Sequence, residues 1–229
     1  MPISKDKCAE RRAMYRELQR TVPGLDGMYR LAHALIAGCD DKTSGVLIVG
    51  AGGGRELEGP AKGRFKGQIT ALDPSAPNLG LARDAASDRG SSLDVRFLVG
   101  TVDDIPQGER FKIVTSLLVM HHLRDDGAKL AYLKGLRDRL APGGRLIHAD
   151  VCFDEIDDFD RLVPIYLAHA DIVGVSADAA RLELDAIPKL PVILGRRTCA
   201  LFAKAGLAEP FEIFRSLWYR CWTSGRAPQ

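Results

Sequence analysis

Short apolar runs alternate with helical or turn-rich stretches along the central part of this chain. The runs occupy residues 46–50, 69–72, 95–99, 113–119 and 145–149. Runs of this length that are rich in branched residues predict strands buried on both faces. Their alternation with helical segments is typical of a parallel sheet that helices cover on both sides. The pattern therefore predicts an α/β fold.

The segments on either side of this alternation predict helices and a terminal hairpin. Residues 7–20 and 26–37 have helical composition, and a Val-Pro-Gly turn at 22–24 separates them. The second helix is amphipathic, and its predicted buried side is formed by Met28, Leu31, Leu35 and Ile36. We expect four parts: an N-terminal helical lid (1–44), a core (45–153), a helical cap insertion (154–195), and a C-terminal helix with a strand hairpin (196–229).

The most informative segment is the glycine-rich sequence at residues 50–54, directly after the first apolar run. Glycines let the backbone turn tightly and approach a ligand where a Cβ atom would clash. Asp73 ends the next predicted strand, where an acidic residue can hold ribose hydroxyls. Arg55 stands where a dinucleotide-binding loop has its third glycine. The spacing therefore favours a nucleoside without a pyrophosphate, of which S-adenosylmethionine is the common case.

Charge and cysteine content indicate which partners and which cellular compartment to expect. The chain has 32 Lys and Arg against 30 Asp and Glu, and no run of like charge reaches five residues, so a nucleic-acid partner is not indicated. The five cysteines are scattered, which fits reduced thiols in a cytosol and gives no zinc spacing. Because the sequence shows neither a signal peptide nor an apolar run of membrane-spanning length, we expect a cytoplasmic protein without a membrane partner. The sequence leaves open whether the protein forms a homodimer.

The order of the motifs resembles that of the class I S-adenosylmethionine-dependent methyltransferases over residues 45–151. The matching segments are residues 50–54, 72–75, 100–106, 116–123 and 140–146. This resemblance implies a Rossmann-like seven-stranded mixed sheet with helices on both faces and an antiparallel last strand. The cofactor is then expected over the loops at the carboxyl ends of the strands. More loosely, residues 20–24 and 204–207 resemble the branch that contains the carboxymethyl-uridine tRNA enzymes and many small-molecule methyltransferases.

The resemblance also implies a set of cofactor-binding residues. They are Gly50, Ala51, Gly52, Gly54, Arg55, Asp73, Pro74, Ser75, Thr101, Val102, Asp103, Ser116 and Leu117. Within this set Asp73 is expected to hold the ribose, and Arg55 is either a partner of the cofactor carboxylate or a solvated side chain. Ile48 departs from the family pattern, in which an acid usually ends the first strand and helps to hold the methionine ammonium group. Thr101 replaces the usual adenine-contacting Asp.

His121 and His122 are the candidates for a catalytic role, because they follow the fourth strand on the family's methyl-transfer side. Adjacent histidines at such a place are also common helix-cap residues. His148 lies within an apolar strand and is expected to be a hydrogen-bonded core residue. Asp150, at the end of that strand, either faces the substrate or makes a structural hydrogen bond.

The sequence thus predicts a methyltransferase that uses S-adenosylmethionine and acts on a small-molecule acceptor by in-line transfer. Alignment of the two reactants is expected to supply most of the catalysis, with a base needed only for a hydroxyl or protonated amine acceptor. Three alternatives remain. One is an enzyme of the tRNA wobble-uridine pathway, another a nicotinamide-dependent redox enzyme, which Arg55 disfavours, and the third a non-catalytic protein that retains the cofactor fold.

Overall fold

The structure is a computed structural model that describes residues 16, 17, 19–38, 45–60, 65, 67–87 and 93–228. Within these residues the strands form a sheet in the order β3-β2-β1-β4-β5-β8-β7, and a short strand, β6, pairs with β5. The strands are β1 (Val46–Val49), β2 (Ile69–Asp73), β3 (Val95–Val99), β4 (Phe111–Leu117), β5 (Leu140–Phe153), β6 (Ile193–Leu194), β7 (Phe211–Ser216) and β8 (Tyr219–Ser224).

Strands β1 to β5 are parallel, whereas β8 is antiparallel to β5 and β7 is antiparallel to β8. The predicted seven-stranded mixed sheet with an antiparallel last strand is therefore confirmed, and β6 lies off its path. The strand order places β1 and β4 side by side in the middle of the sheet. The loops that follow these two strands consequently meet at one edge, which is where a ligand is expected in a sheet of this kind.

β1 shows why the apolar pattern gives a sheet covered on both faces. All four of its residues are buried. Val46 and Ile48 pack into one hydrophobic cluster, while Leu47 and Val49 pack into another. Successive side chains of a strand point to opposite faces, so a continuous apolar run requires a hydrophobic layer on each side.

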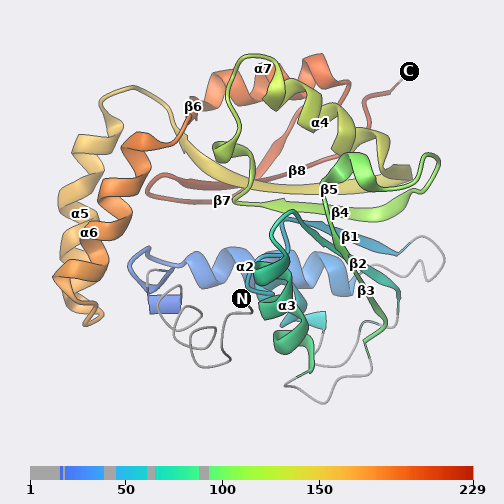
Figure 1. Cartoon of the computed structure of the whole chain (residues 1–229). Coiled ribbons are helices and arrows are strands. Elements are labelled where there is room, and N and C mark those ends of the chain that lie inside the picture. Colours follow the sequence, from blue (N-terminus) through green and yellow to red (C-terminus); the bar gives the residue numbers. More distant parts are fainter. Residues whose placement is uncertain are drawn as a thin grey trace.

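Helices supply these two layers. The α-helices are α2 (Leu25–Ala37), α3 (Ala76–Ser87), α4 (Ala128–Asp138), α5 (Asp158–Ile172), α6 (Ala177–Ala186) and α7 (Gly195–Ala205). Short 3-10 helices are η1 (Arg55–Leu57), η3 (Val102–Asp104), η4 (Met120–His122) and η5 (Ile187–Lys189). Helices α2 and α3 lie on one face of the sheet, and α4 and α7 lie together on the other (Figure 1). This arrangement confirms the expected helices on both faces.

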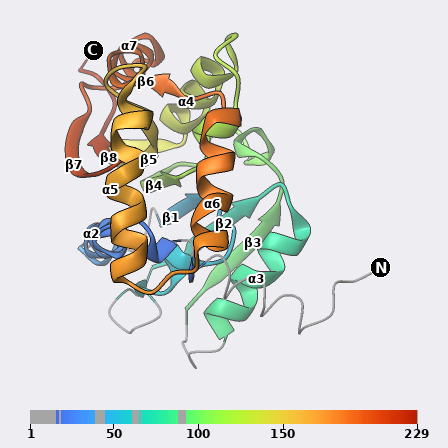
Figure 2. The same cartoon turned by 90° about the vertical axis from the view of Figure 1, so that its left-hand side faces the viewer.

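Helices α5 and α6 form a pair at one end of the molecule (Figure 2). The chain leaves the sheet after β5 and returns as β6, which pairs with Cys152 and Phe153 at the carboxyl end of β5. Glu183 of α6 anchors the pair, because its Oε1 accepts hydrogen bonds from Trp218 Nε1 and Tyr219 Oη, both at 2.9 Å. Burial raises the pKa of this carboxyl group. The pair is thus fixed against the turn between β7 and β8.

The structure differs from the sequence prediction in three local features. Leu31 is 41% exposed, because the buried stripe of α2 runs through Met28 and Ile36 on another side of the helix. Strand β5 begins at Leu140, before the apolar run predicted at residues 145–149, and its pairing to β4 is irregular between Leu140 and Arg145. Most of the helix predicted at 7–20 lies outside the described residues, although residues 16, 17, 19 and 20 are helical.

Candidate functional site

A cavity of about 500 Å³ lies where the loops after β1, β2 and β4 meet. Three segments form most of its wall: the glycine loop after β1, the turn after β2, and the turn after β4. The lining residues are Arg16, Tyr29, Gly50, Ala51, Gly52, Gly53, Arg55, Glu56, Asp73, Pro74, Ser75, Asn78, Leu81, Leu117, Leu118, Val119 and His122. The cavity therefore occupies the edge at which a parallel sheet of this order binds its ligand.

The glycine loop has the shape that the sequence predicted, and two positions require glycine. Gly50 has φ 77°, and a Cβ atom there would lie 2.4 Å from Cγ2 of Val119. Gly54 has φ 78°, and its Cβ would come within 2.9 Å of the Ala82 backbone in α3. By contrast, a Cβ on Gly53 would meet no atom within 4 Å. The loop is thus packed at its two ends and open to the cavity in between.

Asp73 connects this loop to the turn after β2. Its Oδ2 accepts a hydrogen bond of 2.9 Å from the Gly52 backbone nitrogen, and its Oδ1 accepts one of 2.8 Å from the Ser75 nitrogen. Each carboxylate oxygen retains a free lone-pair direction, since it can accept more than one hydrogen bond. Asp73 is only 5% exposed, yet it lines the cavity. The carboxylate is therefore held rigidly where a ligand can reach it.

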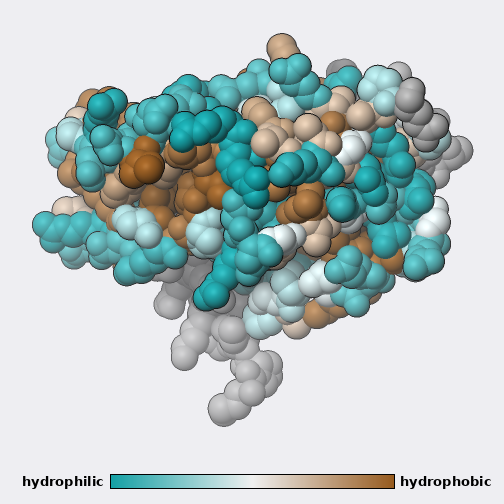
Figure 3. All heavy atoms as spheres, turned by 90° about the horizontal axis from the view of Figure 1, so that it is seen from above, coloured by the Kyte–Doolittle hydropathy of each residue, from teal (hydrophilic) through white to brown (hydrophobic). Residues whose placement is uncertain are grey.

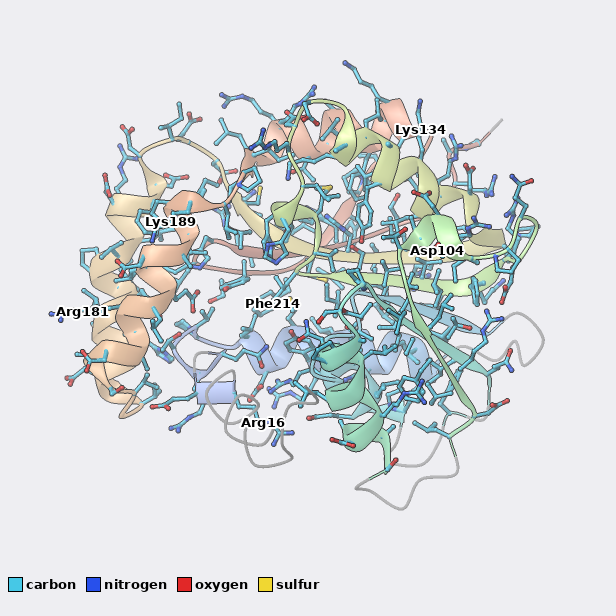
Figure 4. The ribbon with its side chains drawn as sticks, viewed as in Figure 1. Arg16, Asp104, Lys134, Arg181, Lys189 and Phe214 are labelled. Atoms are coloured by element: carbon cyan, nitrogen blue, oxygen red, sulfur yellow. The ribbon has the colours of Figure 1, made fainter. Side chains whose placement is uncertain are left out.

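The two arginines on the wall are already paired with carboxylates. Arg55 forms an ion pair with Asp26 and lies 4.5 Å from the centre of the Tyr29 ring. Arg16 pairs with Glu58 at 2.7 Å, and Figure 4 shows it on the side of the molecule where α2 and α3 lie. Among the described residues, the Nε atom of Arg55 has no hydrogen-bond partner. This atom is buried, and the ion pair with Asp26 already engages the guanidinium group.

The structure brings many of the predicted residues to the cavity and leaves others away from its wall. Those on the wall are Gly50, Ala51, Gly52, Arg55, Asp73, Pro74, Ser75, Leu117 and His122. Gly54, Thr101, Val102, Asp103, Ser116 and His121 are not among the described residues that line it. Thr101 instead caps η3, where its Oγ1 and backbone nitrogen both donate to Asp104 Oδ2. A cofactor role for these residues stays a prediction.

The turn after β4 carries a strained residue and a histidine. Leu118 lines the cavity with φ 62°, a conformation that costs a residue with a Cβ roughly 1–2 kcal/mol. Its backbone nitrogen donates to Ala149 O at 2.7 Å, which holds the turn in place. His122 follows on the wall, and burial together with the neighbouring His121 lowers its pKa below 6.5. His122 is therefore neutral at physiological pH.

Behind this wall His121 is fixed by a carboxylate. Its Nδ1 lies 2.6 Å from Asp150 Oδ1, and its backbone nitrogen donates to the same oxygen at 3.0 Å. The rings of His121 and His122 meet edge to face, with centroids 4.2 Å apart. Asp150 thus makes the structural hydrogen bond that was one of its two predicted roles. The contact between His121 and Asp150 could not be predicted from the sequence, because the two residues are 29 positions apart.

Other buried polar groups surround this pair. Lys129 is completely buried and donates from Nζ to the Met120 carbonyl oxygen at 2.7 Å. His148 was expected to be hydrogen-bonded, and this is wrong: neither ring nitrogen has a partner among the described residues. Its ring lies between Phe202 and Trp222, and burial lowers its pKa to about 4. His148 is consequently a neutral core side chain.

Glu56 is the principal wall residue that the sequence prediction missed. It follows the glycine loop in η1, is 4% exposed and lines the cavity. Burial raises its pKa to about 8. An acid directly after the loop was the only signal in the sequence, and it did not distinguish a buried carboxyl group from a solvated one.

The described residues contain no group of three or more His, Cys, Asp or Glu side chains placed to hold a metal ion. Among the described helices, none combines the length and the apolar character that a membrane span requires.

Comparison with known proteins finds a matching family, a curated relative and two similar solved structures. Residues 46–144 match the family described as "Methyltransferase domain". A relative named "Ubiquinone biosynthesis O-methyltransferase" from Cereibacter sphaeroides (strain ATCC 17025 / ATH 2.4.3) is 34% identical over 103 residues, which are 44% of this chain and 39% of that protein. The match thus spans about two fifths of the length of the relative.

Among solved structures, mitomycin 7-O-methyltransferase aligns with 87% of this chain and 54% of its own, with a TM-score of 0.60 and 19% identity. Magnesium protoporphyrin IX methyltransferase from Synechocystis PCC 6803, solved with bound S-adenosylhomocysteine, aligns with 88% of this chain and 82% of its own, with a TM-score of 0.59 and 15% identity. Similarity at this level of identity concerns the fold.

Proposed function

Because this chain carries a class I S-adenosylmethionine-dependent methyltransferase domain, we propose that it transfers the methyl group of that cofactor to an oxygen atom of a small-molecule acceptor. The observation that carries the proposal is the cavity in which the glycine loop, Asp73 and His122 converge. These residues come from the loops after β1, β2 and β4, where a ligand of such a sheet binds.

The residues present fit the cofactor. The cavity of about 500 Å³ is within the usual range for small-molecule sites, and the open side of Gly53 leaves room for a ligand against the loop. Asp73 would hold the ribose hydroxyls, since its oxygens are fixed by Gly52 and Ser75 and can accept further hydrogen bonds. Arg55 adds a cationic side chain to the same wall, where it is paired with Asp26.

The chain contributes alignment and a base. When bound, S-adenosylmethionine supplies a methyl group that its sulfonium already activates. The rigid loop and the Leu118 turn orient the reactants, which is the main requirement of such a transfer. His122 lies on the wall in its neutral form and accepts the proton of a hydroxyl acceptor. His121, held by Asp150, is a positioning residue for the His122 ring.

Two observations support a small apolar acceptor that carries a hydroxyl group. The curated relative is named a ubiquinone biosynthesis O-methyltransferase, and one similar solved structure is named a mitomycin 7-O-methyltransferase. Seen from above, apolar surface gathers in a hollow on the side of the molecule where α5 and α6 stand (Figure 3). Exposed apolar side chains of these helices are Ile165, Leu167, Ile172 and Leu182. Apolar walls with few polar groups are typical of such sites.

The alternative functions and the setting of the protein stay predictions. A tRNA wobble-uridine pathway enzyme and a non-catalytic cofactor-binding protein have the same core fold. Free thiols at Cys152, Cys199 and Cys221 support the cytoplasmic location that we propose. A homodimer is a prediction that rests on no contact in this structure.

Methyl transfer from labelled S-adenosylmethionine tests the proposal. The purified protein is incubated with a panel of hydroxylated aromatic compounds and quinols, and in parallel with unmodified tRNA. We expect labelled methyl ethers from members of the small-molecule panel and no label in tRNA. Label in tRNA alone, or cofactor binding without transfer to any acceptor, would contradict the proposed acceptor class.

A further inference from the structure

Glu56 is a buried acidic residue of the cavity wall. Its Oε1 accepts a hydrogen bond from Thr115 Oγ1 of β4. No described residue forms an ion pair with it. Glutamate is almost never fully buried unless it is paired, because its charged form loses the solvation of water. Glu56 is therefore a buried carboxyl group without a cationic partner among the described residues, and a cationic group of a ligand can supply one.

Glu56 lies near Ile48 of β1, the position at which the methyltransferases that this chain resembles usually have an acid. Thr115 is the register partner of Ile48 in the parallel pair of β1 and β4. Ile48 is completely buried and offers no polar atom from its side chain. The Glu56 carboxyl group therefore lies beside the position of Ile48 in β1, although Glu56 itself belongs to η1.

Other titratable groups surround Glu56 from several elements. Tyr132 of α4 and Cys221 of β8 have raised pKa values, for which burial is the main cause and the negative charge of Glu56 a smaller one. Both groups are neutral at physiological pH. The remaining titratable side chains on the cavity wall are Arg16, Tyr29, Arg55, Asp73 and His122. Both arginines of the wall are paired with other carboxylates, Arg16 with Glu58 and Arg55 with Asp26.

We propose that Glu56 is the counter-ion for the ammonium group of the cofactor's methionine part, and that cofactor binding releases a proton from Glu56 to solvent. This inference rests on the proposed function, because it assumes that S-adenosylmethionine occupies the cavity. It assigns to Glu56 the role that Ile48 cannot fill.

The protonation state of Glu56 gives this step its direction. With a pKa of about 8, the carboxyl group is largely protonated at pH 7. A cation placed within about 4–6 Å favours the ionised form. On binding, the carboxyl O–H bond breaks, the proton passes to the buffer, and the carboxylate stays beside the ammonium group. Up to one proton is then released per ligand at pH 7.

Titration calorimetry in buffers with different ionisation enthalpies measures this proton directly. The probes are S-adenosylhomocysteine, which has the ammonium group, and 5′-methylthioadenosine, which lacks it. For the wild-type protein at pH 7 we expect the release of up to one proton with S-adenosylhomocysteine and none with methylthioadenosine. The affinity for S-adenosylhomocysteine should increase up to about tenfold per pH unit and level off above pH 8.

Glu56→Gln separates recognition of the ammonium group from a structural role. Glutamine has the shape of the protonated carboxyl group, so the folded cavity should be retained. We expect it to bind S-adenosylhomocysteine at least tenfold more weakly, without proton release, and to bind methylthioadenosine as the wild type does. Glu109→Gln is the matched control, since Glu109 pairs with Arg96 of β3 and is not among the residues lining the cavity.

Each outcome bears on the inference. Proton release that persists in Glu56→Gln, or equal weakening of both ligands, would overturn it. Wild-type binding of S-adenosylhomocysteine without pH dependence below pH 8 would also overturn it, even if the variant failed to fold. If the wild-type protein binds neither ligand, the proposed function fails first, and this result is distinct from a failure at Glu56.

Discussion

Replacement of His122 by alanine is expected to lower kcat for a hydroxyl acceptor by about 10²–10⁴-fold at neutral pH, the usual contribution of a general base. His122 is the histidine on the cavity wall, and burial keeps its pKa below 6.5. The midpoint of the acid limb of the wild-type kcat profile should therefore lie below pH 6.5. The measurement is kcat for both proteins from acid to alkaline pH.

The pH profile distinguishes a base from an aligning side chain. The loss in His122→Ala should become smaller at high pH, where the acceptor ionises without help. S-adenosylhomocysteine should bind the variant as it binds the wild type, which shows that the cavity is intact. A loss below tenfold at every pH would mean that alignment supplies most of the catalysis, as the sequence predicts. Asp150→Asn should lower kcat with little change in KM, because it acts through the orientation of His121.

The stability of the folded protein should depend on pH through Glu56. Its pKa is about 8 in the folded state and 4.5 without burial, so the folded state keeps a proton that the unfolded chain loses. The contribution of Glu56 to stability is fully present below pH 4.5 and is lost as pH rises toward 8. The two pKa values correspond to about 5 kcal/mol, as an upper bound for a buried group.

Urea unfolding of the wild type and Glu56→Gln across this range measures the effect. The free energy of unfolding of the wild type should fall relative to that of the variant from pH 4.5 to 8, and the difference should be constant above pH 8. Glu109→Gln should follow the wild type, since its carboxylate pairs with Arg96 near the surface. If the free energies of unfolding of the wild type and Glu56→Gln changed with pH in the same way, Glu56 would be ionised in the folded protein.

The sheet was predictable because its signals are local. β1 is a continuous apolar run, and its residues pack alternately into the two hydrophobic clusters, as the period of a strand requires. The glycine loop and Asp73 were predictable for the same reason, since conformation and spacing along the chain define them. Leu31 shows the limit of this reasoning, because the composition of a helix does not fix which side faces the core.

The rest of the site depends on contacts between distant segments. Glu56 meets Thr115 across 59 positions, and His121 meets Asp150 across 29. Each pair forms only because adjacent strands bring their ends to one edge of the sheet. His148 was predicted to be hydrogen-bonded from its residue type, but its apolar neighbours Phe202 and Trp222 come from α7 and β8. Such surroundings are set by the order of the strands, which no single motif encodes.

The cofactor assignment is tested most directly by calorimetric titration of the purified protein with S-adenosylhomocysteine and, separately, with NAD. We predict that S-adenosylhomocysteine binds at one site per chain and that NAD does not bind. Asp73→Asn should weaken the binding by about 1.5–3 kcal/mol, the value of hydrogen bonds to a charged group. Binding of NAD at equal or higher affinity, or unchanged binding of S-adenosylhomocysteine to folded Asp73→Asn, would contradict the placement of the cofactor in this cavity.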